Sequence, residues 1–181
     1  MARKKRNRVV GPVTITDIAV EGKSVGRFND LVIFAKGAVP GDVVDVLLKK
    51  KRTSWAEGEV FRFHEHSPDK IPAFCEHFGT CGGCKWQHLS YEKQLSYKQQ
   101  QVVESFRRIA RVEEPPCLPV LGAEKTRYYR NKLEFSFTEN RWLSQEEVAS
   151  GQDFDRRGAG FNLAGHFDRV LDIKHCYLQT D

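Results

Sequence analysis

The chain has 181 residues, of which 40% are hydrophobic and 29% are charged, and it carries a net charge of +5. This length suits one large or two small domains with a filled core. No apolar run approaches the roughly 18 residues of a membrane span, and Val9-Val10-Gly11-Pro12 follows the basic start where a signal peptide would have an apolar stretch, so we expect a cytoplasmic protein without a membrane partner.

The positive charge is concentrated in three clusters along the chain. Their members are Arg3, Lys4, Lys5, Arg6 and Arg8 in the first, Lys49, Lys50, Lys51 and Arg52 in the second, and Arg127, Arg130 and Lys132 in the third. The third cluster is interleaved with Tyr128 and Tyr129. A basic protein with such clusters favours a polyanionic partner, and aromatic rings beside cations favour RNA over a merely solvated surface.

Five short apolar stretches without an intervening helix make up residues 9 to about 66. They are predicted as strands at residues 13–18, 25–28, 31–35, 43–48 and 55–63. The segment Ala38-Val39-Pro40-Gly41-Asp42 has the composition of a turn. Five such strands indicate a small closed barrel of the OB type, which we assign to a first domain of residues 1–66.

Two runs in this barrel carry a resemblance to a known domain. Gly22–Arg27 and Ile33–Asp42, the latter with its G-x-V-P-G-D turn, resemble the TRAM domain of RNA-modifying enzymes. The resemblance implies that the barrel binds RNA.

Three cysteines lie close together in a C-x5-C-x2-C pattern, as Cys75, Cys81 and Cys84. Gly82 and Gly83 stand between the last two and are able to adopt a positive φ that turns backbone amides toward the sulfur atoms. Cys176 lies far downstream and Cys117 stands apart. Four thiolates suit either a tetrahedral zinc ion or a 4Fe–4S cluster, and the three-plus-one spacing favours the cluster.

The clearest helix is predicted at about residues 90–111, with Ser90 as its N-cap. It ends before Pro115-Pro116. Its apolar residues fall on one stripe, formed by Tyr91, Leu95, Val102, Phe106 and Ile109. We expect this stripe to pack across a sheet as part of the core.

The remaining residues are predicted to be rich in strands. Strands are expected at residues 127–137, 141–143, 160–163 and 169–173, with a mobile loop at 144–157. Cys176 then follows the last strand and is free to reach the other cysteines. The expected fold class is therefore β-rich α+β: the barrel, then a central domain of residues 67–181 with a small antiparallel sheet, one long helix and a four-cysteine metal centre.

Taken together, these pieces resemble the N-terminal half of the bacterial 23S rRNA (uracil-5-)-methyltransferases that carry an iron–sulfur cluster. The resemblance covers the TRAM-like barrel, Cys75–Tyr91, Tyr129–Lys132 and Asp172–Gln179. It implies that Cys75, Cys81, Cys84 and Cys176 hold a 4Fe–4S cluster and that Cys117 does not. It also implies that S-adenosylmethionine is bound by a C-terminal Rossmann-like catalytic domain that is absent here, so this chain alone is expected to be an inactive monomer.

We expect the contacts with RNA to come from basic side chains on both domains. The candidates are Lys49, Lys50, Lys51, Arg52, Lys85, Arg127, Arg130 and Lys132. Three alternatives stay open from the sequence: tRNA as the substrate, a zinc-stabilised RNA-binding module without a methyltransferase role, and a ferredoxin-like electron carrier. The basic charge speaks against the last, because a carrier of that kind needs an acidic docking face.

Overall fold

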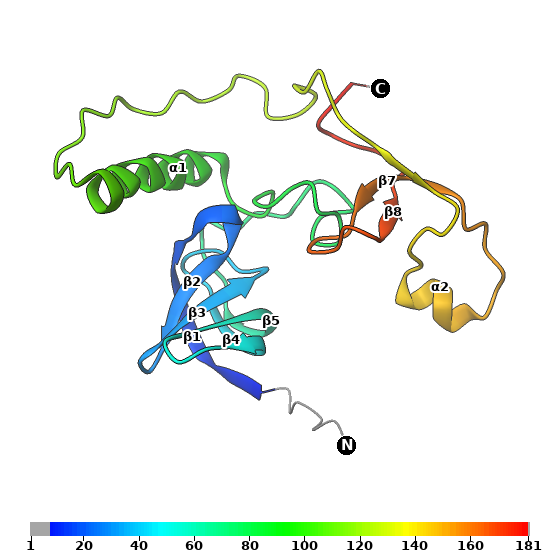
Figure 1. The fold of residues 1–181 in the computed structure, drawn as a ribbon, viewed down its shortest axis with the longest axis horizontal. Coiled ribbons are helices and arrows are strands. Elements are labelled where there is room, and N and C mark those ends of the chain that lie inside the picture. The colour runs from blue at the N-terminus through cyan, green and yellow to red at the C-terminus, as the bar shows by residue number, and fades with distance from the viewer. Residues whose placement is uncertain (1–7, 181) are drawn as a thin grey trace. The chain divides into compact units, whose positions relative to one another are not determined.

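The computed structural model describes residues 8–180, whose contacts group them into two compact units (Figure 1). The first unit combines the segment up to Pro72 with His88–Leu121, and the second combines Ala73–Gln87 with the segment from Gly122 onward. The sequence-based division into residues 1–66 and 67–181 differs from this grouping and stays a prediction. Arg3, Lys4, Lys5 and Arg6 of the first basic cluster lie outside the described residues.

Five strands close into a barrel in the order β1-β2-β3-β5-β4 (Figure 1). Their bounds are β1 Arg8–Ile18, β2 Ser24–Phe28, β3 Leu31–Lys36, β4 Val43–Lys51 and β5 Trp55–Glu65, with a short 3-10 turn η1 at Val20–Gly22 between β1 and β2. Only β3 and β5 pair in parallel; the other pairs are antiparallel. The predicted five-stranded OB-like barrel is therefore confirmed.

The barrel interior is filled by small and β-branched side chains that alternate along each strand. The fully buried ones include Val13, Ile15, Ile33, Val44 and Val46. Because successive side chains of a strand point to opposite faces, their neighbours in sequence form the outer surface. Gly58 on β5 marks a close approach of backbones, since a Cβ there would lie 2.4 Å from the carbonyl oxygen of Leu47.

The predicted turn before β4 contains the polar centre of the first unit, Asp42. Its carboxylate is fully buried and accepts hydrogen bonds from the backbone N–H of Val39 at 2.8 Å and of Ser67 at 2.9 Å. The ammonium of Lys70 adds a third bond at 3.1 Å. Asp42 thus connects the barrel to the segment that leaves it. Gly41, with φ +94°, supplies the left-handed turn that precedes it.

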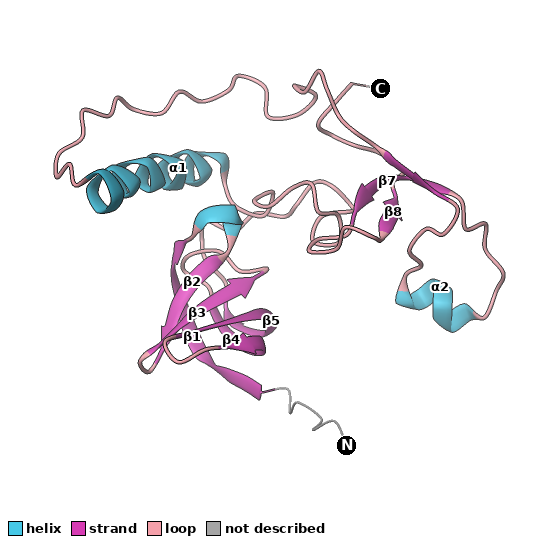
Figure 2. Ribbon diagram, in the orientation of Figure 1, coloured by secondary structure: helices cyan, strands magenta, loops and turns pink. Residues whose placement is uncertain are grey.

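One long helix follows, and its apolar stripe is not buried, contrary to prediction. The helix α1 spans Tyr91–Ser105 and continues as a π-helical turn η2, Phe106–Ala110 (Figure 2). No residue of either segment is buried, and Ile109 is 82% exposed. No helix among the described residues has the length and apolar character needed to cross a bilayer.

The helix contacts the barrel through polar side chains. The amide of Gln101 donates to the carbonyl oxygen of Ile18 at 3.1 Å, and Gln100 lies 3.4 Å from the carboxylate of Asp17. At about 100° per residue, the stripe that contains Val102 and Ile109 faces roughly away from these two glutamines. The contact side of the helix is therefore its glutamine side, which explains the exposed stripe.

The second unit contains a three-stranded antiparallel sheet in the order β6-β7-β8. The strands are β6 Ser136–Thr138, β7 Gly158–Asn162 and β8 Val170–Asp172. The two C-terminal strands match the predicted ones at residues 160–163 and 169–173 to within a few residues. Of the strand predicted at 127–137 only the end is a strand, and none forms at 141–143.

The segment predicted as a mobile loop, residues 144–157, contains a short helix, α2, at Gln145–Ser150. Ser144 caps it by accepting from the backbone N–H of Glu147, and the Glu147 carboxylate accepts from the backbone N–H of Ser144. The Arg141 guanidinium binds the same carboxylate at 2.8 Å. This correction follows from the S-x-x-E spacing at residues 144–147, which is the signature of a capping box.

Candidate metal centre and nucleic-acid interface

The cysteine segment is a compact series of turns within the second unit. The backbone N–H of Phe78 donates to the carbonyl of Cys75 at 3.1 Å, and that of Cys81 donates to the carbonyl of His77 at 2.8 Å. Gly79, at φ +89°, reverses the chain between them. These turns bring Cys75 and Cys81 to the same side of the loop.

The loop is fastened to the end of β7. The backbone N–H of Gly82 donates to the carbonyl of Asn162 at 2.9 Å, and Cys81 forms an isolated bridge with Leu163. A Cβ on Gly82 would lie 2.8 Å from that carbonyl oxygen, so this position needs glycine for close approach. Gly82 and Gly83 were identified as able to adopt a positive φ, but neither adopts one.

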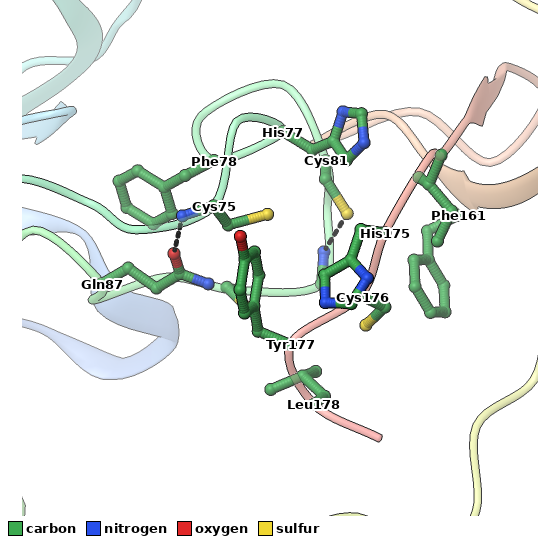
Figure 3. A pocket seen from close by; sticks show the side chains of 13 residues that line it. Cys75, His77, Phe78, Cys81, Gln87, Phe161, His175, Cys176, Tyr177 and Leu178 are labelled. Atoms are coloured by element: carbon green, nitrogen blue, oxygen red, sulfur yellow. Dashed lines mark hydrogen bonds between the residues drawn. The ribbon is translucent and has the colours of Figure 1, made fainter. Parts of the chain in front are cut away.

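The fourth cysteine arrives from the chain that leaves β8. The backbone N–H of Lys174 donates to Nε2 of His77 at 3.1 Å, which holds this segment against the cysteine loop. All four predicted ligands then line one cavity, Cys75, Cys81, Cys84 and Cys176. Figure 3 shows this cavity with Cys75, Cys81 and Cys176 among the side chains around it. Two segments far apart in sequence thus present their thiols to one space.

The cavity has the polarity of a site for soft metals. Its other lining residues are glycine, amide, imidazole, aromatic and aliphatic groups, without a carboxylate or an ammonium. Backbone N–H groups lie close by: that of Gly83 donates to the sulfur of Cys81 at 3.4 Å, and that of Cys75 donates to the Gln87 amide oxygen at 3.3 Å (Figure 3). Thiolate ligands and nearby amides characterise both zinc and iron–sulfur sites.

The thiols influence one another's ionisation. Burial raises the pKa of Cys81 above its ordinary value, the Gly83 N–H opposes this rise, and the other three cysteines add to it. Burial likewise raises the pKa of Cys84, against a hydrogen bond from Gln87 and the charge of Arg130. Four thiolates in this space would repel one another, so the ionised form requires a cationic partner.

Within residues 8–180, no three or more Cys, His, Asp or Glu side chains lie in a group that fits a single metal ion. A lone zinc ion with Zn–S bonds of about 2.3 Å would draw its four sulfur atoms tightly together. A polynuclear cluster binds each thiolate through a different iron atom. Cys117 belongs to the first unit and does not line the cavity.

The predicted RNA contacts of the first unit gather at the connection between β4 and β5. Lys49, Lys50, Lys51 and Arg52 are all exposed there. Lys49 is paired with Glu59 at 3.2 Å, and the ammonium of Lys50 lies 4.9 Å from the ring centroid of Trp55. Trp55 was not predicted as a functional residue, although its position three residues after Arg52, the last residue of a basic run, was a usable signal.

In the second unit, Arg127 and Arg130 lie beside the cysteine cavity. The Arg127 guanidinium stacks 4.0 Å above the ring of Phe74, and the backbone N–H of Arg130 donates to the carbonyl of Leu178 at 2.8 Å. Lys85 is exposed in the cysteine segment, whereas Lys132 forms an exposed ion pair with Glu134. The structure therefore brings two of these four residues to the cavity through backbone and ring contacts.

A group of aromatic residues missed by the sequence analysis surrounds Tyr177. The hydroxyl of Tyr128 lies 3.1 Å from Nε2 of His175, and the ring of Phe74 meets that of Tyr177 edge to face at 5.2 Å. Tyr128 adopts a φ of +54°, which is uncommon for a residue with a side chain. Its backbone N–H is fixed by the carbonyl of Tyr177 at 2.8 Å. The signal in the sequence for this aromatic group was Tyr177, which directly follows the predicted ligand Cys176.

Comparisons with known proteins agree with the barrel and with the chain as a whole. Residues 4–61 match the TRAM domain family. The chain is 50% identical, over 91% of its length, to an uncharacterized RNA methyltransferase of Bacteroides thetaiotaomicron, and 46% identical, over 91%, to one of Porphyromonas gingivalis. It spans 36% of the length of each of these relatives.

Among solved structures, the chain is similar in fold to the tRNA (uracil-54, C5)-methyltransferase of Pyrococcus abyssi, which was crystallised with S-adenosyl-L-homocysteine. The TM-score is 0.51 at 18% identity, and the match covers 94% of this chain and 33% of the other. The chain therefore carries a match to the TRAM domain and is similar over 91% of its length to bacterial proteins named RNA methyltransferases, and it spans 36% of the length of those relatives.

Proposed function

We propose that this chain is the RNA-recognition part of an S-adenosylmethionine-dependent RNA (uracil-C5)-methyltransferase. The TRAM match, the exposed basic residues and the relatives named RNA methyltransferases support this function. S-adenosylmethionine would be bound by a catalytic domain outside this chain. The chain alone would then bind RNA as a monomer and transfer no methyl group.

The proposal includes a 4Fe–4S cluster held by Cys75, Cys81, Cys84 and Cys176. The single observation that carries it is that these four thiols, from two distant segments, line one cavity without a carboxylate among the lining residues. A cluster suits this donor set because each thiolate binds a separate iron atom. When bound, it would supply iron–thiolate bonds that tie the loop at residues 75–84 to the segment after β8.

We assign the cluster a structural role. Methyl transfer to uracil needs no electron, whereas a fixed loop would hold Lys85 and the neighbouring Arg127 and Arg130 in place for RNA. The carboxylate-free lining also suits zinc, so a zinc-stabilised RNA-binding module is the second candidate. Metal analysis separates the two.

The proposed substrate is 23S rRNA, with tRNA as the alternative. The alternative gains support from the Pyrococcus neighbour, whose name states that it modifies tRNA. Equilibrium binding to a 23S rRNA fragment and to tRNA, each measured by fluorescence anisotropy, compares the two directly. The proposed substrate predicts tighter binding of the rRNA fragment.

The same titrations, repeated at several salt concentrations, test RNA recognition itself. We expect log K to fall linearly with log salt, with a slope of about −0.7 for each neutralised phosphate of a single strand. Lys85→Met and Arg127→Met should each reduce the magnitude of this slope by about 0.7, the value for one phosphate contact. Negligible affinity for both RNAs at low salt would contradict the proposed function.

A further inference from the structure

The outer surface of the barrel carries a continuous face across four strands, β2, β3, β5 and β4. On β3, Ile33 and Ala35 are fully buried, so Val32 and Phe34 point outward between them. On β5, Ala56 is fully buried, which turns Trp55 outward at the start of that strand. The two aromatic residues therefore share the outer face of a parallel strand pair.

The strand register sets out this face in two rows. Paired residues on neighbouring strands lie on the same side of a sheet. The rows are Arg27–Val32–Trp55 and Val25–Phe34–Glu57–Lys50. Lys50 joins the second row because the register of β4 and β5 shifts between Leu48 and Lys50. At a strand spacing of about 4.8 Å, four strands give a surface roughly 14 Å across, wide enough for more than one nucleotide.

Two aromatic rings form the centre of this face. Phe34 and Trp55 meet edge to face, with centroids 6.2 Å apart and planes at 78°. Both are partly exposed. The ammonium of Lys50 lies over the Trp55 ring, a weak attraction at an exposed site. A planar base is able to take its place over the ring, and the released ammonium is then free to pair with a phosphate.

The charge around these rings is positive. The one carboxylate in the two rows, that of Glu57, is bound by the ammonium of Lys23 at 3.1 Å. Within residues 8–180, Lys50, Lys51 and Arg52 form no ion pair, and Arg27 is exposed. An acidic protein surface would satisfy these cations, but it has no planar bases to stack on the two aromatic rings in the middle of them. A nucleic-acid strand uses both features.

We propose that this face, Phe34 and Trp55 with Lys50 and Arg27 beside them, binds a single-stranded stretch of the RNA substrate by stacking bases on the two rings. The inference rests on the proposed RNA-binding function and specifies where and in what form the RNA is held on the barrel. A duplex is excluded from this mode, because its bases are stacked inside the helix and unavailable to the rings.

The test is the affinity of the 181-residue chain for a fluorescein-labelled uridine octamer at low salt, measured by anisotropy. We expect Trp55→Ala and Phe34→Ala to weaken binding at least about fivefold each without changing the salt slope, since stacking involves no counterion release. Trp55→Phe, which keeps a ring, should retain most of the affinity. Lys50→Met should weaken binding and reduce the magnitude of the salt slope by about 0.7, the value for one phosphate of a single strand.

Phe61 supplies the matched control. It is also an aromatic residue of β5 and 63% exposed, but it lies about 20 Å along the strand from Trp55. Phe61→Ala should leave the affinity within twofold of the unchanged chain. Replacing the other two tryptophans, by Trp86→Phe and Trp142→Phe, leaves Trp55 as the only tryptophan of the chain. The octamer should then quench the fluorescence of Trp55, which tests binding at this face without changing any of its residues.

Two results would overturn this inference while leaving the proposed function intact. One is RNA binding that Trp55→Ala and Phe34→Ala do not weaken. The other is an absence of Trp55 quenching at saturating octamer. A chain that binds no RNA at all would instead contradict the proposed function, so the two failures are distinguishable. A duplex of equal length should bind Trp55→Ala as well as it binds the unchanged chain, because its bases are unavailable to the rings.

Discussion

At the scale of single residues, the most constrained polar group of the first unit is the Asp42 carboxylate. It is fully buried and satisfies two backbone N–H groups and the ammonium of Lys70. Lys70 in turn lies 3.6 Å above the ring of Phe63. Asp42 therefore holds the turn before β4 and the segment after β5 together.

Removing this carboxylate should be costly. Asp42→Ala leaves two buried N–H groups and a partly buried ammonium without their acceptor, and we expect a loss of about 3 kcal/mol in the free energy of unfolding. Urea denaturation followed by circular dichroism measures it. Asp30→Ala, at an exposed turn, should change the free energy by less than about 0.5 kcal/mol. Equal effects of the two variants would refute this role.

We expect the Asp45 carboxylate to make the stability of the first unit depend on pH. A hydrogen bond from His64, and also the Arg62 guanidinium, hold its pKa below the ordinary value of 3.8, against the opposing effect of burial. The carboxylate therefore contributes stability that is present above pH 3.8 and is lost as the pH falls through the lower pKa of the folded state. The contribution of the ionised Asp45 carboxylate to the free energy of unfolding should vanish in this acidic window.

The measurement compares Asp45→Asn with the unchanged chain in urea titrations from about pH 5 to about pH 2.5. The stability difference between the two should be largest at the upper end and shrink as the pH falls. A difference that stays constant across this range would show that the Asp45 charge contributes nothing through its ionisation.

At the scale of elements, the helix α1 with its π-helical turn η2 departs most from expectation. Its apolar stripe was predicted as core, yet Val102, Phe106 and Ile109 are 50%, 44% and 82% exposed. Periodicity identified the helix and the stripe correctly, but it carries no information about which side of a helix meets a neighbour. The glutamines that bind the end of β1 decide this contact.

The exposure of Ile109 predicts that its substitution destabilises the chain much less than substitution of the buried Ile33. Ile109→Ser should change the free energy of unfolding of this chain by less than about 0.5 kcal/mol, because the side chain buries little surface here. Ile33→Ala, at a fully buried barrel position, should cost about 2–5 kcal/mol. Guanidinium denaturation of both variants measures the two losses in the free energy of unfolding. A loss at Ile109 comparable to that at Ile33 would show that the apolar stripe belongs to the core, as was predicted.

How far the sequence predicted each element depended on how local its signal was. The barrel strands alternate strongly and end at turns such as Pro40-Gly41, so they were found, and the cysteine spacing pointed to one site. The segment at residues 127–132 was mistaken for a strand, because its backbone makes only two bonds to a neighbouring segment, from Tyr128 to Tyr177 and from Arg130 to Leu178. The outer face of Phe34 and Trp55 depends on register, which the sequence does not reveal.

At the scale of the whole molecule, the two units are expected to differ in what holds them together. The first has a buried hydrocarbon core inside a closed barrel. The described part of the second has three short strands, of which β6 and β8 contain three residues each. Under the proposed function, the cluster would supply much of the stability of this second unit as an inorganic crosslink.

This difference predicts a selective effect of a single ligand change. Cys81→Ser should destabilise the second unit while the barrel stays folded. In limited proteolysis of anaerobically purified protein, cleavage should appear within residues 73–87 and 122–180 and spare residues 8–72. Cys117→Ser, outside the cavity, should behave like the unchanged chain. Simultaneous cleavage of both units in Cys81→Ser would contradict the prediction.

The proposed function requires that Cys75, Cys81, Cys84 and Cys176 hold one iron–sulfur cluster. The most direct test of this requirement is the iron and inorganic sulfide content of the anaerobically purified chain, with the absorption near 400 nm that iron–sulfide charge transfer gives. We predict about four iron atoms and about four sulfides per chain, lost in Cys176→Ser and kept in Cys117→Ser. Stoichiometric zinc without sulfide, or iron content unaffected by Cys176→Ser, would contradict the claim.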